Sequence, residues 1–222
     1  MLSTRLNIIK GMIDKGSNVA DIGCDHGLLL IELRKENKKI ELIGIENKIG
    51  PYNTFLNNLK LNKMNDSIEH QLADGLSTLD KKFNTVVIAG MGYPLIKKII
   101  LNNLEKLPFI DTFIIDSPNK IDDLRRFFIS LGFKIDDEKI IEEHSIFYEI
   151  IKFKKGLSSL NEKEFVFGPI LLKEKSPIFI KKYQHLLLEK RNILLNNEID
   201  ATKRNEIIKE IDYIQEVITN ED

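Results

Sequence analysis

Two hydrophobic periods alternate along most of the chain. Short apolar runs, typical of buried strands, are separated by segments in which apolar residues recur every three or four positions, as in amphipathic helices. The pattern predicts strands at residues 19–22, 41–45, 67–71, 84–88, 109–115, 133–138 and 147–153. It predicts helices at residues 2–15, 28–35, 52–61, 94–104 and 121–131. Such alternation predicts an α/β fold with a parallel, doubly wound sheet, to which the last two strands add an antiparallel edge.

The pattern changes near residue 155. Residues 156–159, Gly-Leu-Ser-Ser, are typical of a linker, and residues 176–220 are charged with a helical period. Ile207, Ile211, Ile214 and Ile218 are spaced as in a coiled-coil seam, and residues 196–202 interrupt the period. We therefore expect two domains, an α/β domain at residues 1–155 and a linker with a helical coiled-coil hairpin at residues 156–222.

The most informative motif follows the first predicted strand. It reads Asp21-x-Gly23-x-Asp25-x-Gly27 and leads directly into a helix. Glycine permits a tight turn and close approach of a ligand, and in such sheets ligands bind beyond the carboxyl ends of the strands. Glu46 ends the second strand, where an acidic residue commonly binds the hydroxyls of a ribose. These residues predict a site for a cofactor that contains a nucleoside, although a glycine turn with solvent-facing acids would show the same pattern.

The acidic residues distinguish between cofactors. Asp25 takes the place of the central glycine of a dinucleotide-binding motif, and its charge would oppose a pyrophosphate. Carboxylates instead suit a cofactor with cationic groups, such as the sulfonium and ammonium of S-adenosylmethionine (SAM). A nucleotide-dependent oxidoreductase is therefore the less favoured alternative.

Polar or glycine-containing segments follow three further strands: Asp74-Gly75, Ala89-Gly90-Met91-Gly92 and Ser117-Pro118-Asn119. Asp74 is suited to an adenine amino group, and the sulfur of Met91 to packing on a flat ring. Asn119 carries donors and an acceptor that match an adenine edge. Each segment alone is equally typical of an ordinary turn or a glycine-rich connection.

Composition limits the alternatives. The chain has 222 residues and a formal net charge of −1, so any nucleic-acid contact must come from local basic patches. Its single cysteine, Cys24, excludes an intrachain disulfide and fits a reducing, cytoplasmic location. The four histidines lack ligand spacing, so we expect no metal. No apolar run is long enough to span a bilayer, and we expect no membrane association.

The assembled motifs resemble the TrmK family, bacterial tRNA (adenine-N1)-methyltransferases that modify adenine at position 22. The resemblance covers nearly the whole chain. It rests on Leu2-Ser3-x-Arg5-Leu6, Ala20-Asp21-Ile22-Gly23-x-Asp25-His26, Gly75, Ile88-Ala89-Gly90-Met91-Gly92, Pro118-Asn119 with Arg125, Tyr148-Glu149, Phe167-Gly168-Pro169 and Lys175-x-Pro177. The family usually has glycine where this chain has Tyr93 and glutamine where it has Ser117.

The resemblance implies a class I SAM-dependent methyltransferase fold, a Rossmann-like doubly wound sheet, with a C-terminal coiled-coil domain. It implies that Asp21, Gly23, Glu46, Asp74 and Gly92 surround the cofactor, and we expect further cofactor contacts from Arg5, Asp25, His26, Asn47, Gly75, Ala89, Gly90 and Met91. From their chemistry and their place beside the expected target pocket, we expect catalytic roles for Asp25, Pro118 and Asn119, and substrate contacts from Tyr93, Ser117 and Arg125. We also expect the helical hairpin to bind tRNA and the protein to be a monomer. A non-catalytic RNA-binding module and a small-molecule SAM methyltransferase remain alternatives.

Overall fold

A mixed sheet forms the centre of the molecule. The structure, a computed structural model, describes residues 2–195 and 199–219. The described residues form a seven-stranded sheet in the order β3-β2-β1-β4-β5-β7-β6. Its strands are β1 (Val19–Ile22), β2 (Leu42–Glu46), β3 (Glu69–Leu72), β4 (Thr85–Ala89), β5 (Thr112–Ser117), β6 (Phe133–Glu143) and β7 (Ile146–Lys155). Strands β1 to β5 are parallel and the β6–β7 pair is antiparallel, as the sequence predicts.

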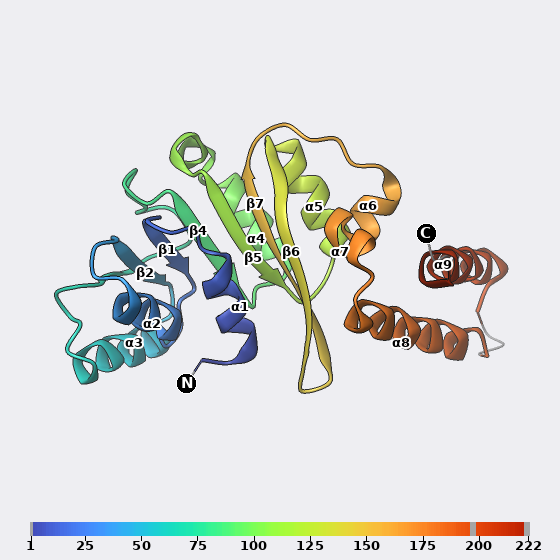
Figure 1. Ribbon diagram of the computed structural model, residues 1–222, viewed down its shortest axis with the longest axis horizontal. Helices are drawn as coiled ribbons and strands as arrows, with labels where there is room; N and C mark the ends of the chain where they lie inside the picture. Colours follow the sequence, from blue (N-terminus) through green and yellow to red (C-terminus); the bar gives the residue numbers. More distant parts are fainter. Residues whose placement is uncertain (1, 196–198, 220–222) are drawn as a thin grey trace.

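Helices cover both faces of this sheet (Figure 1). Side chains of α1 (Thr4–Met12), α2 (Leu28–Glu36) and α3 (Ile49–Leu61) join one apolar core with strand residues such as Val19 and Val87. Those of α4 (Tyr93–Leu101) and α5 (Ile121–Ser130) join a second core with neighbouring strand residues such as Ala20 and Val86. Adjacent strand residues thus enter opposite cores, as the two-residue period of a strand requires. The doubly wound interpretation is confirmed.

Several predicted boundaries are wrong. The helix predicted at residues 94–104 ends at Leu101, and a 3-10 helix, η1 (Leu104–Phe109), follows it. The strand predicted at 133–138 continues to Glu143, because β6 and β7 form a long hairpin. His144 and Ser145 form its turn, both at positive φ (52° and 63°). This conformation is typical of two-residue hairpin loops, because its twist matches that of the two strands.

Two short helices, α6 (Glu162–Phe167) and α7 (Pro169–Glu174), lie between the sheet and the C-terminal hairpin (Figure 1). The hydrophobic pattern did not predict them because six residues are too few to show a period. Asn161 and Glu164 form a capping box at the start of α6, and Gly168 separates the helices at φ +83°.

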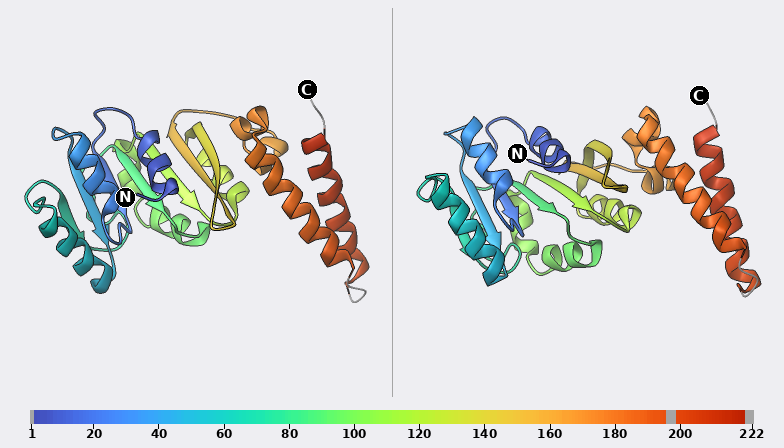
Figure 2. Two further views of the ribbon diagram at one scale, coloured as in Figure 1. Left: turned by 60° about the horizontal axis from the view of Figure 1, so that its bottom comes forward. Right: turned by 90° about the horizontal axis from the view of Figure 1, so that it is seen from below.

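The C-terminal helices α8 (Pro177–Leu194) and α9 (Ala201–Thr219) pack side by side as an antiparallel hairpin (Figure 2). Its apolar seam contains Phe179, Tyr183 and Leu187 from α8 and Ile207, Ile211, Ile214 and Val217 from α9. The predicted seam residue Ile218 is only partly buried beside it. Asp200 accepts a hydrogen bond from the Lys203 N–H at 2.9 Å and caps α9, whereas part of the predicted interruption, residues 196–198, lies outside the described residues.

We expect Leu187→Ala to lower the free energy of unfolding by about 2–4 kcal/mol, because Leu187 is buried in the seam. Leu188→Ala is the matched control, because Leu188 is the next residue along the chain and is 59% exposed. Its loss of unfolding free energy should stay within about 0.5 kcal/mol. Urea unfolding followed by circular dichroism measures both. Equal losses for the two variants would contradict the assigned seam.

Candidate active site

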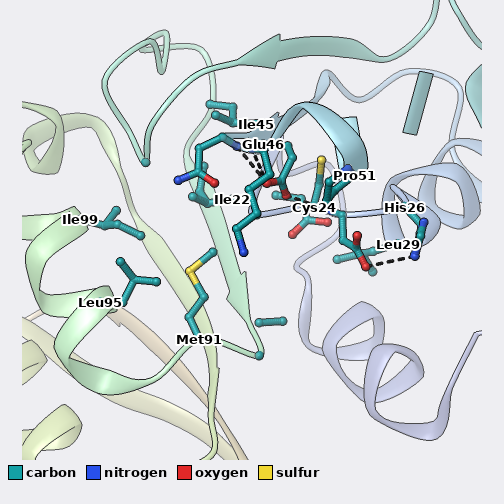
Figure 3. Close-up of a pocket in the computed structure, with 18 of the residues that line it drawn as sticks. Ile22, Cys24, His26, Leu29, Ile45, Glu46, Pro51, Met91, Leu95 and Ile99 are labelled. Carbon is teal, nitrogen blue, oxygen red and sulfur yellow. Dashed lines mark hydrogen bonds and ion pairs between the residues drawn. The ribbon is translucent and has the colours of Figure 1, made fainter. Parts of the chain in front are cut away.

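The loops that follow β1, β2, β3 and β4 meet at one edge of the sheet and enclose a cavity of about 560 Å³ (Figure 3). This volume lies in the usual range for small-molecule sites. The lining includes every residue predicted to contact the cofactor: Arg5, Asp21, Gly23, Asp25, His26, Glu46, Asn47, Asp74, Gly75, Ala89, Gly90, Met91 and Gly92. The structure therefore brings together segments that are separated by almost ninety residues of sequence, as parallel strand ends should do.

The loop after β1 depends on unusual backbone conformations. Gly23, Asp25 and Gly27 all have positive φ values, of 70°, 47° and 67°. A Cβ atom on Gly23 would lie 2.1 Å from the terminal methyl carbon of Met91, and one on Gly27 would lie 2.1 Å from the Phe55 ring. The positive φ favours glycine at both positions, and at Gly27 a side chain would also collide with the buried Phe55 ring, whereas the Met91 methyl beside Gly23 can move aside.

Glu46 ties the first two loops together. Its Oε1 accepts hydrogen bonds from the N–H groups of Asn47 (3.0 Å) and Lys48 (2.9 Å), and its Oε2 accepts one from Asp25 N–H (3.2 Å). A carboxylate has about four accepting positions, so this arrangement leaves one, on Oε2. Glu46 thus keeps accepting capacity for a ribose hydroxyl at the pocket wall.

Asp21 lies at the end of β1, next to Glu46 and 6% exposed. Burial and the negative charge of Glu46 raise the pKa of Asp21 from 3.8 to about 7. Burial, with Asp21 and Glu46, also raises the pKa of the Cys24 thiol, which therefore remains protonated and packs as a small apolar side chain. The pocket thus holds buried negative charge that a cationic ligand would stabilise.

The remaining walls combine polar groups with apolar side chains. Asn47 donates to Asp74 Oδ1 at 3.4 Å, and His26 lies 3.3 Å from Asp25, with both of these side chains exposed. Leu95 and Ile99 of α4 lie on one wall, opposite Glu46 and Pro51 (Figure 3). The sequence did not identify Leu95 and Ile99 as lining residues, because their helical spacing is the same as that of core residues.

Arg5 reaches the pocket from α1. Its Nη1 lies 3.2 Å from Asp116 Oδ2, and its guanidinium stacks over the Tyr148 ring at 4.7 Å. Asp116, the residue before Ser117, is fully buried, and burial raises its pKa to about 6 despite the opposing charge of Arg5. These contacts fix the orientation of Arg5 at the cavity wall.

The loop after β5 lies beside this cavity. The Asn119 side chain is 3.5 Å from the position that a Cβ atom on Gly92 would occupy, so the predicted substrate loop approaches the cofactor loop. Ser117 is buried, and its hydroxyl donates to the Asn119 carbonyl at 3.1 Å, which shapes the loop. Pro118 and Asn119 are exposed, and the Tyr93 ring meets the edge of Phe127 at 6.2 Å.

Arg125, predicted to contact the substrate, does not line the cavity. Its side chain is fully buried, and all three guanidinium nitrogens bond to protein groups: Glu138, Glu149 and the carbonyls of Phe165 and Val166. No donor of Arg125 is exposed for a substrate, so the expectation of a substrate contact is corrected to a role between the sheet and the C-terminal helices. Sequence reasoning missed this because Arg125 is brought to its partners by segments that follow it in the chain.

Among the described residues, no group of three or more His, Cys, Asp or Glu side chains is placed to hold a metal ion. None of the described helices is both long and apolar enough to cross a membrane.

The doubly wound sheet and its acidic pocket define the class of Rossmann-like, SAM-dependent methyltransferases.

Comparison with known proteins identifies the family. A sequence model of TrmK, tRNA (adenine(22)-N(1))-methyltransferase, matches residues 19–218. The tRNA (adenine(22)-N(1))-methyltransferase of Bacillus subtilis strain 168 is 28% identical, with 98% of this chain and 97% of the relative covered. The chain belongs to the TrmK family.

Solved structures agree over the whole length. TrmK of M. capricolum, in complex with S-adenosylhomocysteine, has a TM-score of 0.87 and 29% identity, covering 98% of each chain. Streptococcus pneumoniae Sp1610 in complex with SAM has a TM-score of 0.91 and 32% identity, covering 98% of this chain and 100% of that one.

We predict that the Asp21 carboxyl titrates near pH 7 in the free protein. The folded protein holds this proton more tightly than the unfolded chain, so the stabilisation from protonation is complete below about pH 4 and is lost as the pH rises through about 7. Asp21→Asn should therefore reduce the difference in the free energy of unfolding between about pH 5 and about pH 8. Urea unfolding at the two pH values measures it, and an unchanged difference would refute the assignment.

Proposed function

We propose that this protein transfers a methyl group from SAM to N1 of adenine 22 in tRNA. The observation that carries the proposal is the acidic cavity with Asn119 directly beside its rim at Gly92. The cavity suits a cationic methyl donor, and Asn119 offers an amide donor and acceptor to the edge of an adenine base. Membership of the TrmK family supports the same reaction.

The pocket residues suit the separate parts of SAM. Asp21 and Asp25 provide negative charge for its ammonium and sulfonium groups, and Glu46 provides an acceptor for a ribose hydroxyl. Asp74 is suited to the adenine amino group, whereas the Arg5 guanidinium, held by Asp116 and Tyr148, is suited to the carboxylate. Gly23, Gly75, Ala89, Gly90 and Gly92 permit close approach of the ligand, and Asn47, His26 and Met91 complete the wall.

When bound, SAM supplies a methyl group that the lone pair of adenine N1 attacks, while the electrons of the carbon–sulfur bond pass to sulfur. The neutral base carries no proton on N1, so the protein does not need a general base. Asn119 and Pro118 would orient the base, and this positioning can lower such a barrier by roughly 7–11 kcal/mol in favourable cases. Asp25 would favour the positive charge that develops on adenine.

The substrate base must leave its stack to reach the pocket, which costs a few kcal/mol. Tyr93 begins α4 beside the Asn119 loop, and its ring is held by the edge of Phe127 and by Lys97, whose Nζ lies 5.8 Å from the ring centre. Stacking of the extruded base on Tyr93 would offset that cost by roughly 1–3 kcal/mol. Ser117 stabilises the loop through the hydrogen bond that its hydroxyl donates to the Asn119 carbonyl.

The helical hairpin would hold the body of the tRNA through its lysines. Lys181 and Lys190 are paired with Glu142 and Glu210 in the free protein. Exposed pairs of this kind contribute about 0–1 kcal/mol, so phosphates can replace the glutamates at low cost.

We propose that the protein works as a monomer in the cytoplasm, where tRNA is available and Cys24 stays reduced.

The direct test incubates the protein with SAM and two tRNA transcripts that differ at position 22, adenine or guanine, and then digests the RNA to nucleosides. We expect 1-methyladenosine from the first transcript and none from the second. Binding of the first transcript with no methylated nucleoside would favour a non-catalytic RNA-binding module instead.

Asn119→Ala should lower the turnover rate at saturating tRNA roughly 10- to 100-fold, because one hydrogen bond to the base is lost in the transition state. Asn65→Ala, at an exposed asparagine between α3 and β3, is the matched control and should leave the rate unchanged. Release of labelled methyl into tRNA measures both rates. Unchanged turnover in the Asn119 variant would remove this residue from the mechanism.

A further inference from the structure

A cluster of four charged side chains lies where the sheet meets the C-terminal helices. We call Arg125, Glu138, Glu149 and Lys182 the junction cluster. The side chains of Arg125 and Glu138 are fully buried, that of Glu149 is 2% exposed, and that of Lys182 is 23% exposed. Arg125 Nε donates to Glu138 Oε1 at 2.8 Å, Arg125 Nη2 donates to Glu149, and Lys182 Nζ donates to the other oxygen of Glu149.

The cluster also binds the chain that leads to the hairpin. Arg125 Nη1 donates to the carbonyls of Phe165 (3.0 Å) and Val166 (3.2 Å) in α6, while Glu138 Oε2 accepts from Ile170 N–H (3.0 Å) in α7. A Cβ atom on Gly168, between these helices, would lie 2.6 Å from Arg125 Nη2 and from both Glu138 oxygens. Because of this contact, α6 and α7 can approach the cluster only with glycine at position 168.

The same residues lead directly to the substrate loop. Arg125 lies in α5, which begins at Ile121, two residues after Asn119. Glu149 is the residue of β7 that pairs with Ser117 of β5. The loop that carries Pro118 and Asn119 therefore runs from β5, the neighbour of β7, into α5, and the cluster joins α5 and β7 to α8 of the hairpin through Lys182.

Stability alone does not account for such a cluster. Buried ion pairs often contribute no more to folding than apolar side chains of the same size, but separating one partner leaves a costly unpaired charge. Apolar contacts such as Phe167 with Tyr183 can shift without that penalty. The cluster thus restricts the hairpin to the arrangement in which all four charges are paired.

We propose that the junction cluster fixes the hairpin relative to the Pro118–Asn119 loop, so that tRNA held by the hairpin presents its adenine to that loop. Its members are positioning residues, since none of them lines the cofactor cavity. The proposal rests on the proposed function, because it requires tRNA to bind the hairpin and to be methylated at the loop.

Lys182→Met tests the proposal, because it removes the charge that the hairpin contributes to the cluster and leaves Arg125 with both glutamates. We expect the single-turnover rate at saturating tRNA to fall about 10- to 100-fold, as for a displaced substrate. The dissociation constants for SAM and tRNA should stay within about threefold, a factor that corresponds to less than 1 kcal/mol. Lys182→Arg keeps the charge and should restore most of the rate.

Lys35→Met is the matched control. Lys35 lies in α2, outside the hairpin and the cavity lining, with a side chain 47% exposed and paired with Glu32. A similar fall in rate for both variants, or weaker tRNA binding in the Lys182 variant, would overturn the proposal, because the loss would then not come from the position of the hairpin. A rate within twofold of the unmodified protein in Lys182→Met would also overturn it. Failure of the proposed function is distinct, because the unmodified protein would then form no 1-methyladenosine.

Discussion

The active site depends on two buried carboxylates, Asp21 in β1 and Glu46 at the end of β2. Burial and the negative charge of Glu46 raise the pKa of Asp21 to about 7. Such an arrangement is costly in an empty pocket and favourable around a cation. The preference for SAM over a dinucleotide therefore follows from the charge of the pocket, whereas the fold alone would accept either cofactor.

The sheet order explains why the pocket lies where it does. From β1 the chain builds one side of the sheet through β2 and β3, and then returns to place β4 and β5 on the other side. The loops after β1 and β4 diverge at this reversal, and a ligand can enter between them. Gly23 follows β1 and Gly92 follows β4, both line the cavity, and Gly92 lies beside Asn119. The cofactor site and the substrate loop are thus adjacent because β4 and β5 are neighbours.

The sequence was sufficient for the parts of this architecture that depend on local pattern. Asp21, Glu46, Asp74 and Gly90 could be assigned to one edge because each lies at or just after the carboxyl end of a recognisable parallel strand. Arg125 could not be placed, since its burial depends on β6, β7 and α6, which lie far along the chain and of which α6 showed no period. The hydrogen bonds that Glu46 accepts from Asn47, Lys48 and Asp25 could not be predicted for a similar reason, because they depend on loop geometry that no spacing reveals.

The chain therefore joins an acidic cofactor pocket to a charged helical hairpin through a buried ionic junction, and the pocket is the part on which the chemistry depends. Isothermal titration of SAM into the unmodified protein, Glu46→Gln and the exposed control Glu41→Gln tests it most directly. We expect Glu46→Gln to weaken binding roughly 10- to 100-fold, the value of a hydrogen bond to a charged group, and Glu41→Gln to leave it unchanged. Equal affinity in all three proteins would contradict the account.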